Sequence, residues 1–194
     1  MYKTIGHQTI QKTQETILER LKKGPIHSPY KNQYGQVLLK PPFAGSGYYF
    51  WEDNIKAAKW FGKVRYKEKG LEYRIFKVDI NLTYDDNSLL DLIGNIQHLH
   101  LFKNMINETK KSLKEKCEEW KLHQYLYYYR HLNKKINGVF PFKMVRFADD
   151  SKKYIKGDVL KLSENQNFME INPFFIICIF EKRNIPIESY VHLE

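Results

Sequence analysis

The feature of this sequence that most constrains its fold is a long helical block with strand-like segments on both sides. The block covers residues 86–135, where apolar side chains recur at helical spacing, beginning with Leu89, Leu90, Leu92, Ile93 and Ile96. Strand-like segments precede and follow it, at 2–7, 47–51, 73–82, 139–147, 159–162 and 174–180. Grouped strands and helices favour an α+β fold over a doubly wound sheet, in which the two would alternate.

The part before this block predicts two shorter helices separated by a loop. The first helix carries apolar residues at helical spacing and ends at a Gly-Pro pair; these residues are Ile10, Ile17, Leu18 and Leu21. Residues 25–44 are rich in Pro, Gly and Tyr and predict a loop, which at this length is usually functional or disordered. Asp53 is the expected N-cap of the second helix, over 54–61.

Length and composition indicate one domain, residues 1–194, with enough apolar side chains for a core: 42% are hydrophobic and 15% aromatic. We expect a cytoplasmic protein, because no apolar run is long enough to span a membrane and the start lacks the layout of a signal peptide. Cys117 and Cys178 give neither a disulfide framework nor metal-ligand spacing, and Cys178 is expected to be buried. His98 and His100 fall on different faces of a helix, so no metal site is expected there.

The formal net charge of +10 favours acidic partners such as nucleic acid or a dinucleotide, although a Lys-rich solvated surface explains it equally well. An aromatic cluster in the helical block leaves a similar choice. The cluster consists of Tyr125, Tyr127, Tyr128 and Tyr129, followed by Arg130, Lys134 and Lys135. Its rings either stack on unpaired bases of a nucleic acid or lie half in the core and half at an interface.

Two motifs carry the chemistry when they are taken together. The first is Ile5-Gly6-His7-Gln8-Thr9, and the second is Gly45-Ser46-Gly47-Tyr48-Tyr49-Phe50, with Trp60 eleven residues after Tyr49. Singly, each has an ordinary structural explanation as a buried histidine, a turn or a core strand. Their combination resembles the NAD-binding ADP-ribosyltransferase fold, in the diphtheria-toxin and PARP-like branch, which has a His–Tyr–Glu triad on a split β-sheet.

The resemblance implies catalytic roles for His7, Tyr49 and Glu170, and cofactor-binding roles for Gln8, Thr9, Gly47, Tyr48, Trp60 and Gln166. Breaking the nicotinamide–ribose bond passes through an oxocarbenium-like transition state. Two aromatic faces, Tyr49 and Trp60, clamp the cationic ring, and His7 bonds a ribose hydroxyl. The backbone of Gln8, which stands where the family has Gly, is expected to hold the carboxamide.

The third member of the triad is the least clear. In the family a Glu, or in some bacterial members a Gln, lies near the start of a late strand, but the apolar strand 174–180 begins without either. Glu170 is the first candidate and Gln166 the next, with Glu164 beside them. If neither Glu170 nor Gln166 points into the site, the protein binds NAD without transferring ADP-ribose.

Weaker similarities extend along the chain. Segment 77–80 and Leu90-Asp91-Leu92 are similar to a strand and turn of bacterial members, and 142–147 to a later strand. Arg146 in that strand forms an ion pair at the core edge or meets the NAD diphosphate. The helical region about 86–135 contains a stretch, 95–135, with no counterpart in the family, so we expect a helical insertion.

The resemblance therefore predicts a mono-ADP-ribosyltransferase that uses NAD, without a metal, to modify a macromolecular acceptor, either nucleic acid (DNA or RNA) or protein. A small basic domain of this kind looks like the toxin of a toxin–antitoxin or phage-defence system, with an antitoxin protein as a possible partner. The alternative is a non-catalytic module that binds nucleic acid or a partner. A third option is the RNA 2′-phosphotransferase branch, whose further His and Arg residues have no clear positions here.

Overall fold

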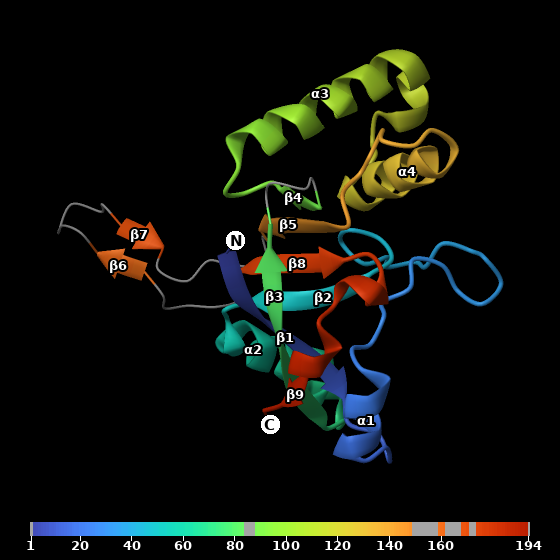
Figure 1. Cartoon of the computed structure of the whole chain (residues 1–194). Helices are drawn as coiled ribbons and strands as arrows, with labels where there is room; N and C mark the ends of the chain where they lie inside the picture. The colour runs from blue at the N-terminus through green and yellow to red at the C-terminus, as the bar shows by residue number, and fades with distance from the viewer. Residues whose placement is uncertain (1, 84–87, 149–158, 162–167, 171–173, 194) are drawn as a thin grey trace.

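The structure, a computed structural model, describes the chain except residues 1, 84–87, 149–158, 162–167, 171–173 and 194. Its centre is a mixed seven-stranded sheet in the order β4-β5-β8-β2-β1-β3-β9 (Figure 1). The strands are β1 (Tyr2–Gln11), β2 (Tyr48–Glu52), β3 (Tyr73–Leu82), β4 (Leu89–Asp91), β5 (Met144–Ala148), β8 (Phe175–Ile179) and β9 (Val191–His192). Strands β6 (Val159–Lys161) and β7 (Phe168–Glu170) pair in a separate two-stranded sheet. The expected α+β class is confirmed.

The helices are α1 (Ile17–Lys23), α2 (Ile55–Arg65), α3 (Ile96–Leu113) and α4 (Leu122–Lys135), with short 3-10 turns at Lys67–Lys69, Lys114–Cys117, Lys182–Asn184 and Ile187–Ser189. The N-cap of α2 is Asn54, whose side chain accepts a hydrogen bond from the Ala57 amide, so the prediction of Asp53 was wrong by one residue. The Asp53 carboxylate instead binds the Thr4 hydroxyl and the Ile5 amide, at 2.8 and 3.0 Å.

Two predicted helical segments are strand in the structure. Ile10 belongs to β1, and α1 starts only at Ile17, after a capping box made by Thr16 and Glu19. Leu89–Asp91 forms β4, which runs parallel to β5 and is buried along its whole length. A short apolar run buried on both faces has the same residue pattern in a strand as in a buried helix, which explains the second error.

The sheet separates two cores. One contains Ala57 of α2, Phe102 of α3 and Leu126 of α4, and the other is closed by α1 and the C-terminal segment around Tyr190. Since successive side chains of a strand point to opposite faces, Tyr49 and Trp51 face the first core while Tyr48 and Phe50 face the second. Cys178 is fully buried in the first core, as predicted.

The sheet opens between its two central strands. β1 pairs with β3 along all ten of its residues but with β2 only at Gly6↔Glu52 and His7↔Trp51. At this crossing a Cβ on Gly6 would lie 2.8 Å from Phe50 Cβ, so only glycine lets the strands approach. Beyond His7 the strands separate, and loop 25–44 lies at the gap, where Ser28 forms a bridge with Gly47. In the described residues, no helix has the length and apolar character needed to cross a membrane.

Candidate functional site

A cleft of about 570 Å³ lies where β1 and β2 separate, a size typical of small-molecule sites. Its walls come from β1, β2, α2, β8 and loop 25–44. The lining residues are Gln8, Thr9, Ile10, Ile26, Ser28, Lys40, Pro42, Phe43, Tyr49, Phe50, Trp51, Trp60, Phe61, Arg65, Tyr66 and Ile176. Four residues of the predicted site, Gln8, Thr9, Tyr49 and Trp60, therefore share one cavity.

The lining is aromatic and carries positive charge only. Trp60 of α2 stacks on Phe174 with ring centroids 6.3 Å apart and packs edge-on against Trp51 at 6.4 Å, which fixes its indole in the cleft wall. Lys40 and Arg65 are the charged residues of the lining, which includes no carboxylate among the residues that the structure describes. Such a cavity suits a flat ring joined to an anionic group.

Tyr49 contributes its ring to the cleft and its hydroxyl to the loop. The hydroxyl donates to the Gly45 carbonyl at 2.6 Å and accepts from the Ala44 amide at 2.9 Å. Burial raises the pKa of Tyr49, and the neighbouring Cys178 thiol raises it further. The phenol therefore stays protonated, and what Tyr49 offers a ligand is the face of its ring.

His7 adjoins the cleft without lining it. The side chain is 8% exposed, and its Nδ1 has no hydrogen-bond partner among the described residues. Burial lowers the pKa of His7, while a hydrogen bond with the Trp51 backbone and the charge of Asp53 partly oppose this. His7 is thus a neutral imidazole near pH 7, and its unpartnered Nδ1 is buried beside the cleft.

The Gln8 side chain has a structural role in the wall of the cleft. The Gln8 amide bonds both backbone groups of Ile26, at 2.8 and 2.9 Å, and so ties the loop to β1. Ile5 directs its N–H and C=O toward Asp53 on the β2 side, so strand alternation turns the peptide groups of Gln8 to β3 and those of Thr9 to the open gap. The expectation that the Gln8 backbone faces a ligand is wrong for this reason, and Thr9 takes that place.

Gly47 and Tyr48 are not among the lining residues of the cleft, and their binding roles stay predictions. A Cβ on Gly47 would collide with Cys178 Sγ, so this glycine is needed for the close approach of β2 to β8. Tyr48 packs against the second core, on the sheet face opposite Tyr49, with its ring 5.1 Å from that of His27.

The third triad position remains a prediction. On β8 the residues beside Tyr49 and Trp51 are Cys178 and Ile176, which are apolar. Glu170 ends β7, but its side chain lies outside the described part of the chain, and Gln166 lies outside it entirely.

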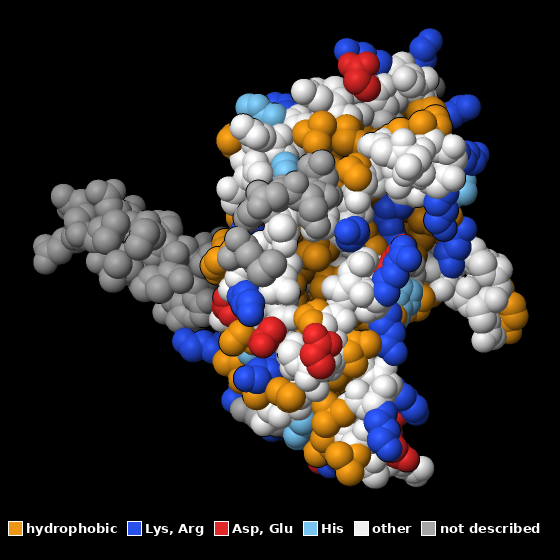
Figure 2. All heavy atoms as spheres, viewed as in Figure 1, with side chains coloured by type: hydrophobic (Ala, Val, Ile, Leu, Met, Phe, Trp, Pro, Cys, Tyr) orange, Lys and Arg blue, Asp and Glu red, His pale blue; other side chains and the backbone are white. Residues whose placement is uncertain are grey.

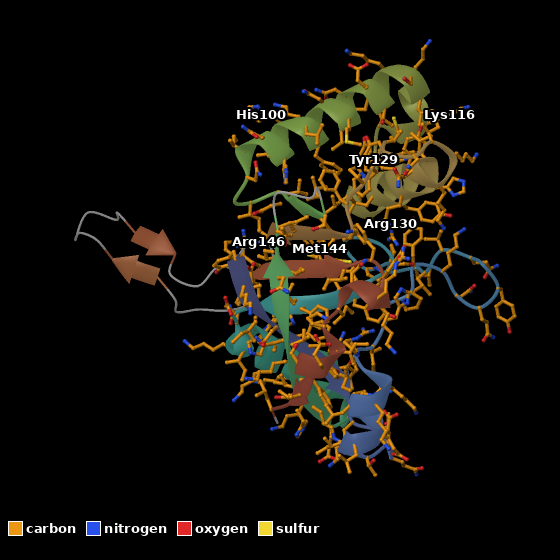
Figure 3. The ribbon with its side chains drawn as sticks, in the orientation of Figure 1. His100, Lys116, Tyr129, Arg130, Met144 and Arg146 are labelled. Atoms are coloured by element: carbon orange, nitrogen blue, oxygen red, sulfur yellow. The ribbon has the colours of Figure 1, made fainter. Side chains whose placement is uncertain are left out.

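Arg146 is an ion-pair residue of the sheet edge. Its guanidinium donates to Glu52 Oε2 at 2.6 Å and to Asp91 Oδ2 at 3.1 Å, and it covers the Phe175 ring at 4.9 Å. It is not among the lining residues of the cleft. Of the two alternatives from the sequence, the core-edge ion pair is the one the structure contains. Figure 3 shows Arg146 at one end of the sheet, away from Arg130.

Some lining residues were not predicted. Phe61 and Arg65 lie one helical turn apart on α2, so the i,i+4 spacing places them on one face and Phe61 directly follows Trp60. Lys40 and Phe43 belong to the loop that was expected to be functional, yet nothing local distinguishes them from its other residues.

In the described ranges, no group of three or more His, Cys, Asp or Glu side chains is placed to hold a metal ion.

A comparison of the chain with protein-family models, curated proteins and solved structures found no match in any of the three.

Proposed function

We propose that this protein binds NAD in the cleft between β1 and β2 and transfers ADP-ribose from it to a macromolecular acceptor. The observation that carries the proposal is the cleft itself: an aromatic cavity with two cations and no carboxylate in its described lining, formed by the two motifs that resemble the ADP-ribosyltransferases. If the protein is the toxin of a toxin–antitoxin or phage-defence system, it has two macromolecular partners: the acceptor that it modifies and an antitoxin that neutralises it.

Each residue has a role suited to its surroundings. The rings of Tyr49 and Trp60 hold the nicotinamide, since a cation over an aromatic face gains about 0.5–2 kcal/mol. Lys40 and Arg65 balance the diphosphate charge. Neutral His7 is the expected hydrogen-bond partner of a ribose hydroxyl, and its buried Nδ1 must become accessible when NAD binds. NAD supplies the leaving group and the ADP-ribose, and Glu170 or Gln166 is expected to complete the site.

Nicotinamide release by the purified protein tests the proposal directly. We expect Trp60→Ala to lower the rate about tenfold, the loss of one ring contact, and Arg65→Ala to raise KM for NAD with little change in kcat, because it removes uniform binding. Lys63→Ala on the same helix is the matched control, since Lys63 is exposed and outside the cleft lining. Absence of both NAD binding by calorimetry and nicotinamide release would rule out the proposal.

A non-catalytic module is the second candidate, and one observation favours it: the β8 residues next to Tyr49 and Trp51 are Cys178 and Ile176, neither of which supplies a carboxylate. Its signature is strongly salt-dependent binding of nucleic acid or a partner with no release of nicotinamide.

A further inference from the structure

The positive charge of this protein is concentrated in two segments of the chain. Residues 20–51 contain five Lys and Arg and no Asp or Glu, and residues 120–148 contain six and again none. These eleven cations account for the whole formal net charge of +10, because the other 21 Lys and Arg are balanced by 22 Asp and Glu.

The fold brings loop 25–44 of the first segment against α4 of the second, whereas Arg20 and Lys23 pair with Glu15, and Arg146 pairs with Glu52 and Asp91. Tyr30 in the loop packs against Tyr127 and His123 of α4, with ring centroids 5.0 and 5.7 Å apart. The Lys31 ammonium lies 5.2 Å from the centre of the Tyr127 ring. Arg130 reaches from α4 toward the sheet and donates to the Ser46 carbonyl at 2.8 Å (Figure 3). We call the surface made by loop 25–44 and α4 the basic face; Lys and Arg side chains gather along that side in Figure 2.

The basic face also exposes aromatic side chains, of which Tyr127 keeps part of its surface open although Tyr30, Lys31 and His131 contact its ring. On α4, Tyr125 and Tyr129 are buried, whereas Tyr127 is 41% exposed and stacks on His131 with an interplanar angle of 11°. Lys134 continues the same helix face, at i+7 from Tyr127, and Lys135 adjoins it. The aromatic cluster is therefore half core and half surface, and its surface half combines rings with cations.

We propose that the basic face binds a single-stranded nucleic acid, with its phosphates at Lys31, Lys134 and Lys135 and its unpaired bases stacked on Tyr127 and His131. Clustered cations attract any polyanion, but ring faces contact only bases that are not paired within a duplex. An acidic protein would satisfy the same charge, so competition by an acidic polypeptide is one outcome of the test.

The basic face continues into the cleft. Lys40 and Phe43 of the same loop line the cavity, while Tyr30 contacts α4. A single-stranded nucleic acid bound along α4 therefore extends to the mouth of the proposed NAD site. This nucleic acid is then the acceptor of ADP-ribose. This last step rests on the proposed transferase activity, whereas binding of the strand does not.

Fluorescence anisotropy with a labelled oligonucleotide of about 15 mixed-sequence nucleotides tests binding in the absence of NAD. The single-stranded DNA, the single-stranded RNA and the duplex form separate arms, and poly-glutamate serves as a competitor. We expect Lys134→Glu/Lys135→Glu to weaken single-strand binding at least about tenfold and to reduce the slope of log K against log salt by about 1.4, since each phosphate contact contributes about 0.7. Tyr127→Ala should weaken it about tenfold through one lost stack.

The matched control is Lys103→Glu/Lys110→Glu, which makes the same charge change on exposed positions of α3. It should bind like the wild type. Equal binding of duplex and single strand, equal competition by poly-glutamate, an unaffected Tyr127→Ala or an equally weakened control would each overturn the proposal. Nicotinamide release measured without nucleic acid separates the two ideas: if the strand binds but no nicotinamide forms, the transferase proposal fails and the basic face stands.

Discussion

Replacing Arg146 with Met is expected to destabilise the sheet edge strongly, because it leaves two buried carboxylates without their cation. Glu52 is 5% exposed and Asp91 fully buried, and the Arg146 side chain itself is only 13% exposed. Removing one partner of a buried ionic group costs about 3–5 kcal/mol. For a domain of this size, each kcal/mol shifts Tm by about 2–4 °C, so Arg146→Met should lower Tm by about 6–20 °C.

The size of this effect should depend on pH in the variant. Burial raises the pKa of Glu52 in the wild type, and Arg146 partly opposes the rise. Without Arg146, the folded-state pKa of Glu52 lies further above its unfolded value, so the penalty is complete at high pH and decreases as the pH falls through the folded value. The difference in the free energy of unfolding between the two proteins should therefore narrow from pH 8 to pH 5.

Thermal and urea unfolding at several pH values measure both quantities. Lys143→Met is the control, because it removes one cation just before the same strand but from an exposed position. A Tm change of less than about 2 °C for Arg146→Met, at pH 8, would refute the account of the ion pair. A loss of NAD binding without a loss of stability would instead assign Arg146 to the diphosphate.

Three further substitutions test the cleft and its supports. Burial lowers the pKa of His7 in the folded protein. The free energy of unfolding should therefore fall as the pH drops below the unfolded-state pKa of about 6.5, by up to about 1.4 kcal/mol per pH unit until the folded-state pKa is reached. His7→Gln should flatten this fall in urea unfolding, and an unchanged pH profile would contradict the account. Gly47→Ala should lower the free energy of unfolding by about 1–3 kcal/mol, because the new Cβ collides with Cys178. Adding Cys178→Ala to this variant should recover part of that loss. If the effects of the two substitutions on urea unfolding simply add, the collision is not the cause. The Thr9 hydroxyl donates to the Ala58 carbonyl at 2.7 Å in a buried site, so Thr9→Val should lower the free energy of unfolding by about 1 kcal/mol. Thr9→Ser keeps the hydroxyl and should not lower it. Thermal unfolding of both variants measures the difference.

Regular alternation made some parts of the fold readable in advance. β3 has the predicted bounds Tyr73–Leu82, because its buried and exposed residues alternate as a half-buried strand requires. Within the predicted strand 174–180, residues Phe175–Ile179 form β8, which carries Cys178 into the core. The short β4 at Leu89–Asp91 was missed, since three residues are too few to show a period.

The sequence by itself determined the α+β class, the strand and helix that carry Tyr49 and Trp60, and the unbalanced positive charge. These follow from local residue patterns and composition, which do not depend on distant parts of the chain. Only the tertiary structure decided that Arg146 meets Glu52 and Asp91 and not the cleft. The same holds for the basic face, since loop 25–44 and α4 lie about 100 residues apart in the sequence and form one surface only because Tyr30 packs on Tyr127.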